Sequence, residues 1–199
     1  MENREYREHF QRSRRYKILD NSVNELLEPV SLTKLLNDAA LVKADAIVIP
    51  DYTNDADQTF ANVKAFLSTP ESNTYLFFSV IQGTTVQECL SLARRYDTLG
   101  LTHIAIPCTV TCNRTDPFGK MVEARLRIVS DIVTSCHFAV IHLLGVSQPE
   151  ELPLHHHSQR TKLSVDTGSP ILNAMNLIRY GGPITLMPKG FPIPFEKAL

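Results

Sequence analysis

The fold is decided by the stretch from Tyr75 to Ile106, which reads YLFFSVIQGTTVQECLSLARRYDTLGLTHIAI. An apolar and aromatic run, Tyr75–Ile81, is followed by Val86–Leu99, where apolar residues recur at three- and four-residue steps, and then by the short run His103–Ile106. The first and last runs are typical of buried strands, and the middle segment is typical of an amphipathic helix. Because a helix carries the chain back between the two strands, we expect the strands to be parallel.

The same pattern extends outward along the chain in both directions. The further predicted strands are Lys17–Leu19, Ala46–Ile49, Phe138–Leu144 and Lys162–Val165, and the further predicted helices are Leu32–Val42, Asp57–Leu67 and Met121–Val133. A unit that repeats every roughly 25 to 35 residues suits consecutive right-handed crossovers in a barrel or in a doubly wound sheet. We predict the barrel, so the fold class is α/β with a TIM-like (βα) barrel. Fewer than the usual eight strands are visible, so we expect the barrel to be incomplete or irregular, with Ile184–Met187 as a candidate for one irregular strand.

The composition indicates a single domain with one hydrophobic core. The chain has 199 residues, of which 43% are hydrophobic, and its formal net charge is -1. This balance supplies no global attraction for nucleic acid, so such binding would need a local basic surface. Residues 1–16 form a basic N-terminal segment ahead of the predicted domain, 17–199. Its basic residues are Arg4, Arg7, Arg12, Arg14 and Arg15, with Lys17 directly after it, and its acidic residues are Glu2, Glu5 and Glu8. The segment is either a phosphate-facing arm or a solvated helix, and the solvated helix is the commoner case.

Hydropathy and cysteine usage indicate a cytoplasmic protein without metal or other cofactor. The apolar runs are short and broken by charge, so the sequence predicts neither a membrane span nor a secretory signal. The four cysteines, Cys89, Cys108, Cys112 and Cys136, form no Cys-x-x-Cys pair, which argues against a disulfide framework and a structural zinc site. The tract His155–His157 offers adjacent ligands without rigid geometry. His142 faces either the core or a pocket mouth, and the core is favoured.

Polar residues follow several of the predicted strands at the point where each strand ends. Asp20, Asp51, Gln82 with Gly83, and Asp166 occupy these positions. Because the carboxyl ends of parallel barrel strands open on one face, these side chains can converge on one pocket. Two carboxylates in one pocket suit glycosyl chemistry, and Gln82 can read the edge of a planar ligand that Gly83 allows to approach the backbone. Each aspartate could instead cap the helix or turn that follows it.

The strand-end series resembles that of the tRNA-guanine transglycosylases, and more closely that of their short phage and bacterial relatives that insert 7-deazaguanines into DNA. The resemblance covers roughly Ile18 to Asn176. The stretches that carry it are Lys17-Ile18-Leu19-Asp20-Asn21-Ser22, Ile47-Val48-Ile49-Pro50-Asp51, Ser79-Val80-Ile81-Gln82-Gly83, His142-Leu143-Leu144-Gly145-Val146 and Val165-Asp166. They are similar, in order, to the family's Asp-Ser-Gly-Gly segment, second strand-end Asp, Val-Gln-Gly-Gly strand, Leu-Met-Gly-Val segment and Val-Asp strand.

The resemblance implies that guanine in nucleic acid is exchanged for a 7-deazaguanine through a covalent sugar-enzyme intermediate. Asp166 would be the nucleophile and Asp20 the general base. The residues that would bind the base are Asp51, Gln82, Gly83, Ile106, Pro107 and Gly145. The target base must be flipped out or arrive in a single strand, since it cannot be reached inside a stacked helix. The expected partners are therefore nucleic acid and the free 7-deazaguanine base.

Three departures from the family pattern keep alternatives open. The family has a second aspartate three residues after the nucleophile, where this chain has Ser169, and Ile106-Pro107 stands where the family has a Gly-Gly pair. The Cys/His zinc subdomain of the tRNA enzymes has no counterpart, which favours DNA over tRNA. One alternative is a non-catalytic relative that serves as a partner or nucleic-acid-binding subunit in a homo- or hetero-oligomer. The other is an unrelated (βα)-barrel enzyme with a small-molecule substrate.

Overall fold

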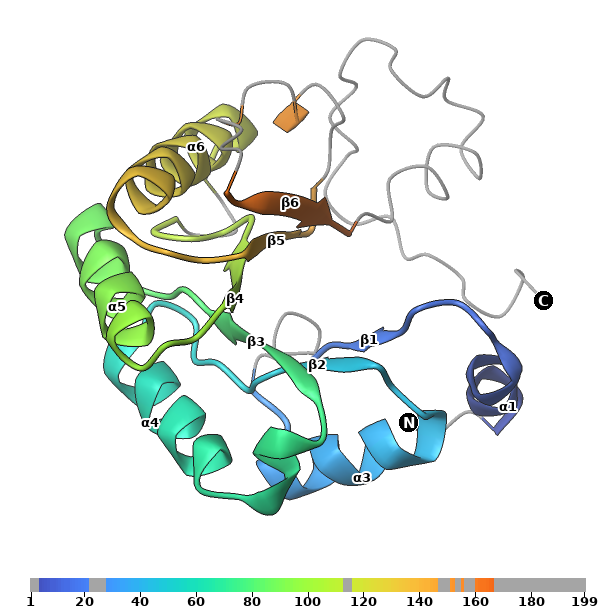
Figure 1. Cartoon of the computed structure of the whole chain (residues 1–199). Helices are drawn as coiled ribbons and strands as arrows, with labels where there is room; N and C mark the ends of the chain where they lie inside the picture. The colour runs from blue at the N-terminus through green and yellow to red at the C-terminus, as the bar shows by residue number, and fades with distance from the viewer. Residues whose placement is uncertain are drawn as a thin grey trace, which may run out of the picture.

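The computed structural model describes residues 4–21, 28–112, 116–146, 151–152, 155 and 160–166. These residues contain a six-stranded sheet in the order β1-β2-β3-β4-β5-β6, with every neighbouring pair parallel. The strands are β1 (Ile18–Leu19), β2 (Ala46–Val48), β3 (Leu76–Val80), β4 (His103–Pro107), β5 (Val140–Leu144) and β6 (Lys162–Val165). The sheet curls into a half barrel with helices on its outer side (Figure 1). The predicted parallel (βα) arrangement is confirmed to this extent, while the candidate strand near Ile184–Met187 lies outside the described residues.

Four helices make the crossovers between successive strands from β1 to β5, and local capping marks where three of them begin. They are α3 (Leu32–Val42), α4 (Ala56–Leu67), α5 (Val86–Thr98) and α6 (Phe118–Ser135), and a short 3-10 helix, η1 (Pro70–Asn73), precedes β3. The side chains of Ser31, Asp55 and Thr85 each accept a backbone N–H from the first turn of the following helix. All four predicted helices are confirmed, and α6 is longer than predicted because an apolar period marks a buried face, not the helix ends. Among the helices described, none has both the length and the apolar character needed to span a bilayer.

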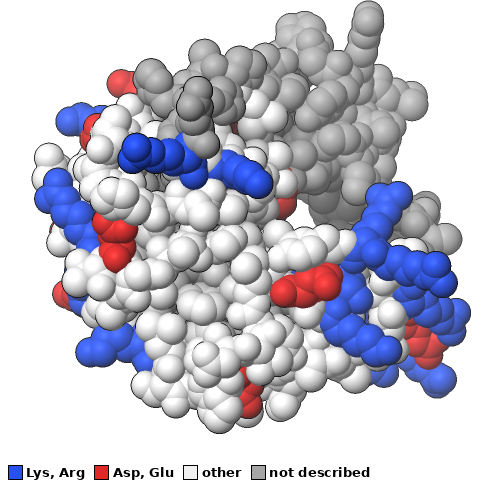
Figure 2. All heavy atoms as spheres, in the orientation of Figure 1, with Lys and Arg blue, Asp and Glu red and all other residues white. Residues whose placement is uncertain are grey.

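The basic N-terminal segment forms a further helix, α1 (Arg4–Arg12), which packs against α3. The Gln11 side-chain amide donates to the carbonyl of Leu41 at 2.6 Å. The Lys17 ammonium donates to the carbonyls of Phe10 at 3.4 Å and Val42 at 3.0 Å. These bonds hold α1 and the start of β1 against the first crossover helix, and Lys and Arg side chains gather over this part of the surface (Figure 2).

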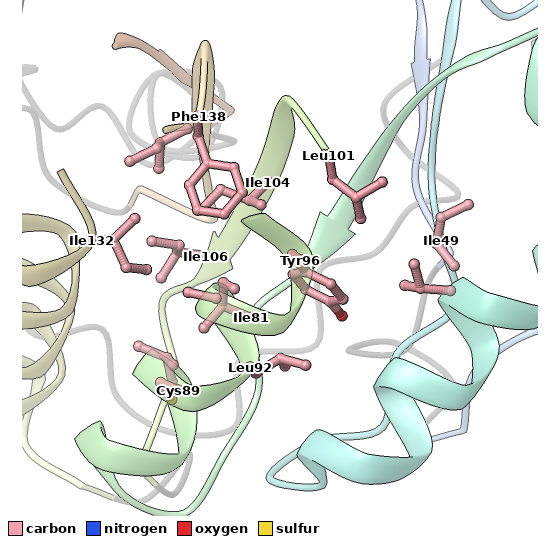
Figure 3. Packing of buried hydrophobic residues seen from close by; sticks show 14 of the residues in the cluster. Ile49, Ile81, Cys89, Leu92, Tyr96, Leu101, Ile104, Ile106, Ile132 and Phe138 are labelled. Carbon is pink, nitrogen blue, oxygen red and sulfur yellow. The ribbon is translucent and has the colours of Figure 1, made fainter. Parts of the chain in front are cut away.

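Side chains on both faces of the central strands are buried, as is common in parallel sheets. The outer face contributes Ile47, Ile49, Ile81, Ile104, Ile106, Ile141 and Leu143 to a cluster that includes buried residues of the helices. In Figure 3, Leu92 and Tyr96 lie on α5 opposite strand residues of this cluster. The inner face has a smaller cluster of Ala46, Val48, Phe78, Val80 and Ala105. Residues two apart within a strand therefore face the same side of the sheet.

Candidate functional site

The polar residues predicted from the sequence lie at the carboxyl-terminal edge of the sheet. Asp20 directly follows β1 and Asp166 directly follows β6, while Asp51 and Gln82 come within three residues of the ends of β2 and β3. Because all strands are parallel, these ends share one edge. The structure divides the residues into two groups, one on β1–β3 and the other on β5–β6.

The first group is a buried hydrogen-bonded network around the Asp51 carboxylate. The Asn21 amide donates to Asp51 Oδ1 at 2.6 Å, and the Gln82 amide donates to Asp51 Oδ2 at 2.5 Å. The same Asn21 amide donates to the carbonyl of Ile49, and the backbone N–H of Asn54 donates to Gln82 Oε1 at 3.1 Å. The side chains of Asn21, Asp51 and Gln82 are all buried. The ends of three neighbouring strands are thus joined through one carboxylate.

Burial raises the pKa of the Asp51 carboxyl group. Removal from water raises the pKa of Asp51, and the hydrogen bonds from Gln82 and Asn21 only partly oppose that effect. The carboxylate also accepts its own backbone N–H, and because a carboxylate has about four lone-pair sites, three donors leave room for one ligand N–H. Asp51 and Gln82 together therefore offer acceptors and an amide donor at one place.

Helix α4 fixes the loop that carries Asp51. The Asn62 amide donates to the carbonyl of Pro50 at 2.9 Å. The Thr59 hydroxyl accepts the backbone N–H of Tyr52 at 2.9 Å and donates to its carbonyl at 3.3 Å. Both residues flanking Asp51 are therefore tied to the helix that follows, which limits the freedom of the carboxylate.

The second group surrounds Asp166 at the end of β6. Its Oδ1 accepts the backbone N–H of Gly145 at 2.6 Å, and its own N–H donates to the carbonyl of Leu143 at 3.2 Å. Gly145 has a φ of 65°, a left-handed conformation that favours glycine. The Asp166 side chain is 58% exposed. One carboxylate oxygen is thus fixed by a backbone donor on a side chain that solvent and ligands can reach.

His142 lies beside this carboxylate on the inner face of β5. Its Nδ1 is 2.7 Å from the Ser164 hydroxyl, and its Nε2 is 3.9 Å from Asp166 Oδ1. Burial lowers the pKa of His142, and the charge of Asp166 only partly opposes that change. The ring also packs against Phe78, with centroids 5.3 Å apart. The predicted core position of His142 is confirmed, and the structure adds its approach to Asp166.

Asp20 is exposed, and the adjacent residue Asn21 connects it to the Asp51 network. Its carboxylate accepts the backbone N–H of Asn21 at 2.8 Å, and the Asn21 side chain in turn holds Asp51. Asp20 and Asp166 lie on the first and last strands of the described sheet, so β2–β5 separate them along the edge. Ser22 and Ser169, which the sequence interpretation also used, lie outside the described residues.

The remaining predicted base-binding residues have packing roles. The Ile106 side chain lies in the cluster on the outer face of the sheet, and Pro107 is buried in the pairing of β4 with β5. A Cβ on Gly83 would lie 2.9 Å from the Cβ of Glu88. The absent side chain of Gly83 therefore makes room for the first turn of α5, whereas the sequence interpretation had related it to a ligand.

The sequence interpretation missed a buried ion pair next to the second group. The Arg125 guanidinium on α6 donates to both oxygens of Glu151, at 2.7 and 2.5 Å, and to the carbonyl of Leu144 at 2.7 Å. His155 Nε2 is 3.0 Å from Glu151 Oε1. Burial would raise the pKa of Glu151, but the hydrogen bonds from His155 and Arg125 and the charge of Arg125 lower it overall.

This ion pair anchors the end of β5 immediately before Gly145, so it supports the backbone that holds Asp166. A signal for it exists in the sequence, because Arg125 falls on the same helical face as Ile128, Val129 and Ile132. The first histidine of the His155–His157 tract belongs to this pair, and His156 and His157 lie outside the described residues. Within the part of the chain that the structure describes, no three His, Cys, Asp or Glu residues are arranged to hold a metal ion.

No protein-family model matches the chain, and no curated protein matches it.

Proposed function

We propose that the chain is a guanine transglycosylase-like enzyme that replaces guanine in nucleic acid with a 7-deazaguanine base, acting on DNA in preference to tRNA. We also propose that a (βα) barrel is completed beyond the six described strands. The observation that carries the proposal is the buried contact between Asp51 and Gln82 at neighbouring strand ends. Guanine and 7-deazaguanine present N–H donors beside a carbonyl acceptor, and a carboxylate next to an amide complements that edge.

The pleat of the sheet supports a shared pocket for the base and the nucleophile. Gln82 comes two residues after Val80, which belongs to the inner cluster. Asp166 comes two residues after Ser164, whose hydroxyl bonds to His142. Since strand residues two apart face the same side, Gln82 and Asp166 are both expected to face the interior of the half barrel. Asp51 comes two residues after Ile49 of the outer cluster, and the Gln82 amide connects it to the interior side.

The proposed chemistry requires no external oxidant or reductant. A carboxylate oxygen of Asp166 forms a bond to the sugar C1′ while the C1′–N9 bond breaks, and guanine leaves with the electron pair and takes up a proton from water at nitrogen. In the second step the corresponding ring nitrogen of the 7-deazaguanine attacks C1′, its proton passes to Asp20, and the ester bond to Asp166 breaks. The Gly145 N–H occupies Asp166 Oδ1, which leaves Oδ2 for the attack.

The test is incubation of the full chain with guanine-containing DNA, or with tRNA, and a labelled 7-deazaguanine. We expect label in DNA and release of an equal amount of guanine. Label in tRNA alone would support the exchange reaction but overturn the proposed preference for DNA. Label in neither polymer, with correctly folded protein, would overturn the enzymatic proposal.

One observation favours a second candidate, a non-catalytic nucleic-acid-binding relative. Asp51 and Gln82 hydrogen-bond to each other, so part of their capacity is already used within the protein. Under this candidate, the network serves to hold three strand ends together. Polynucleotide binding without any incorporation of label would favour it.

A further inference from the structure

A cleft of about 630 Å³ lies between α1 and the start of β1, away from the Asp51 and Asp166 groups. Arg12, Arg15, Tyr16, Lys17 and Ile18 are among the residues that line it. The described lining contains these three cationic side chains and no carboxylate. The cleft therefore suits an anionic ligand.

The nearby carboxylates do not neutralise the positive charge around the cleft. The Glu8 carboxylate is shared by two guanidinium groups, with Arg4 Nε at 2.8 Å and Arg12 Nη2 at 3.4 Å. The Arg12 side chain is nevertheless 81% exposed. Nearby, Asp45 accepts the backbone N–H of Lys17 at 2.7 Å, so this carboxylate already has a partner in the chain. The gathering of basic side chains in Figure 2 is thus a local feature of a chain with a net charge of -1.

The same cleft has an exposed aromatic wall. Tyr16 is 63% exposed, and Ile18, two residues along the chain, is 37% exposed, so both can contact a ligand in the cleft. A positively charged groove combined with an aromatic ring is the arrangement by which proteins hold single-stranded nucleic acid without reading its sequence. The cations contact phosphates, and a base stacks on the ring.

The position of the cleft connects it to the proposed reaction. Ile18 lines the cleft, and Asp20 lies two residues further along extended chain, a separation of about 7 Å. This is close to the spacing of successive phosphates in an extended strand. The cleft lies at the start of β1 and Asp20 follows the end of this strand, so the two-residue strand joins the cleft to the carboxyl edge. A strand with one base at the site would pass the cleft within a few nucleotides.

We propose that this cleft binds the sugar-phosphate backbone of a single-stranded segment next to the target base, with Arg12 and Arg15 on phosphates and Tyr16 stacked on a base. The inference deepens the proposed function and rests on it for the identity of the strand. Binding is measured without any exchange of bases, so the two proposals can fail separately.

The experiment measures binding of a fluorescent single-stranded oligodeoxynucleotide to the full chain over a range of salt concentrations. The double variant Arg12→Gln, Arg15→Gln is compared with Arg94→Gln, Arg127→Gln, which removes the same charge from exposed positions on α5 and α6. Each phosphate contact on a single strand contributes about 0.7 to the salt slope, so the first pair should lower the slope by about 1.4 and the control pair should leave it unchanged. Tyr16→Ala should weaken binding by about 5- to 100-fold, and Tyr16→Phe should keep it.

Circular dichroism establishes that each variant is folded. Equal affinities and salt slopes for the Arg12/Arg15 double variant and the Arg94/Arg127 control variant would overturn the inference, even if the wild type exchanges guanine. A wild type that binds phosphatidylserine vesicles but no oligonucleotide would also overturn it, in favour of a membrane surface. If the Arg12/Arg15 double variant loses oligonucleotide binding and the wild type exchanges no base, the result would support nucleic-acid binding in the cleft and overturn the enzymatic proposal.

Discussion

At the scale of single residues, Asp51 and Asp166 have different surroundings although both follow a strand. Asp51 is buried and accepts two side-chain amides, whereas Asp166 is exposed and accepts one backbone N–H. A buried carboxylate held by amides is suited to recognition, because its geometry is fixed. An exposed carboxylate with one oxygen held is suited to attack, because the other oxygen is accessible. These surroundings agree with the roles that the proposed exchange gives to the two residues.

The proposed roles of Asp166 and Asp20 predict separable effects of two substitutions. Asp166→Asn should abolish both the exchange and any covalent adduct, because an amide cannot form the glycosyl ester. Asp20→Asn should slow the exchange while leaving some adduct, since attack and proton transfer are separate steps. Denaturing gels of protein mixed with labelled DNA would show the adduct as a shifted band. An unchanged adduct in Asp166→Asn would remove this residue from the nucleophile role.

The altered acidity of Asp51 predicts a pH-dependent contribution to stability. Its pKa is raised by burial, so the contribution is present below the ordinary Asp pKa of about 3.9 and is lost as pH rises through the raised value. The Asp51→Asn variant should therefore gain stability relative to wild type between pH 4 and neutrality, as measured by urea denaturation.

Asp55→Asn is the matched control. Hydrogen bonds from Gln58 lower the pKa of Asp55, so the contribution of Asp55 to stability increases with pH, opposite to that of Asp51. This variant should lose stability relative to wild type as pH rises through the acid range. A difference between Asp51→Asn and wild type that stays constant with pH would contradict the assignment.

At the scale of elements, the sequence predicted what depends on local pattern. Apolar runs and helical periods located six strands and four crossover helices, because each element buries one face or stripe. For the Arg4–Arg12 segment the sequence does not separate a phosphate-facing arm from a solvated helix, because both are rich in charged residues. The contact of Asn21 with Asp51 and the pair of Arg125 with Glu151 could not be predicted, because the partners are 30 and 26 residues apart. Such contacts depend on register and on loop paths that local pattern does not encode.

The junction between β3 and α5 predicts that Gly83 is needed for packing. A Cβ at Gly83 would lie 2.9 Å from Glu88 Cβ and 3.1 Å from the backbone nitrogen of Cys89, so α5 would have to shift. Gly83→Ala should lower the free energy of unfolding by about 1–3 kcal/mol, in the range of overpacking. Gly119→Ala is the control, because a Cβ there meets nothing within 4 Å in helix α6. Equal stabilities of the two variants in urea denaturation would contradict the packing role.

The buried pair of Arg125 and Glu151 predicts strong coupling between α6 and the segment after β5. Arg125→Met should lower the free energy of unfolding by about 3–5 kcal/mol at neutral pH, because it removes the guanidinium from a buried carboxylate and leaves His155 as the side chain within hydrogen-bond distance of Glu151. The loss should diminish at low pH, where Glu151 is protonated. The double variant Arg125→Met, Glu151→Gln should lose less than the sum of the single variants. Additive losses in urea denaturation would contradict the coupling.

At the scale of the whole molecule, the described half barrel brings the residues of the proposed function to one edge and one side. The carboxyl edge carries Asp51, Gln82 and Asp166, and the side of β1 carries the basic cleft. A ligand that uses all of these must be extended and anionic, and a polynucleotide has both properties. A small molecule would use one group only, which is how oligonucleotide binding separates the proposed function from a small-molecule barrel enzyme.

The chemistry of the cysteines predicts that the whole chain folds without zinc. Zinc binds thiolates, yet burial raises the pKa of Cys89 to about 12 and also raises that of Cys108 and Cys136. Cys89, Cys112 and Cys136 are buried and all four cysteines are free, and Cys89 and Cys136 belong to the outer-face apolar cluster. Thermal unfolding should therefore be unchanged by a chelator, and the unfolded chain should show four reactive thiols without added reductant. Stoichiometric zinc that resists chelation, followed by unfolding once the metal is removed, would contradict this prediction.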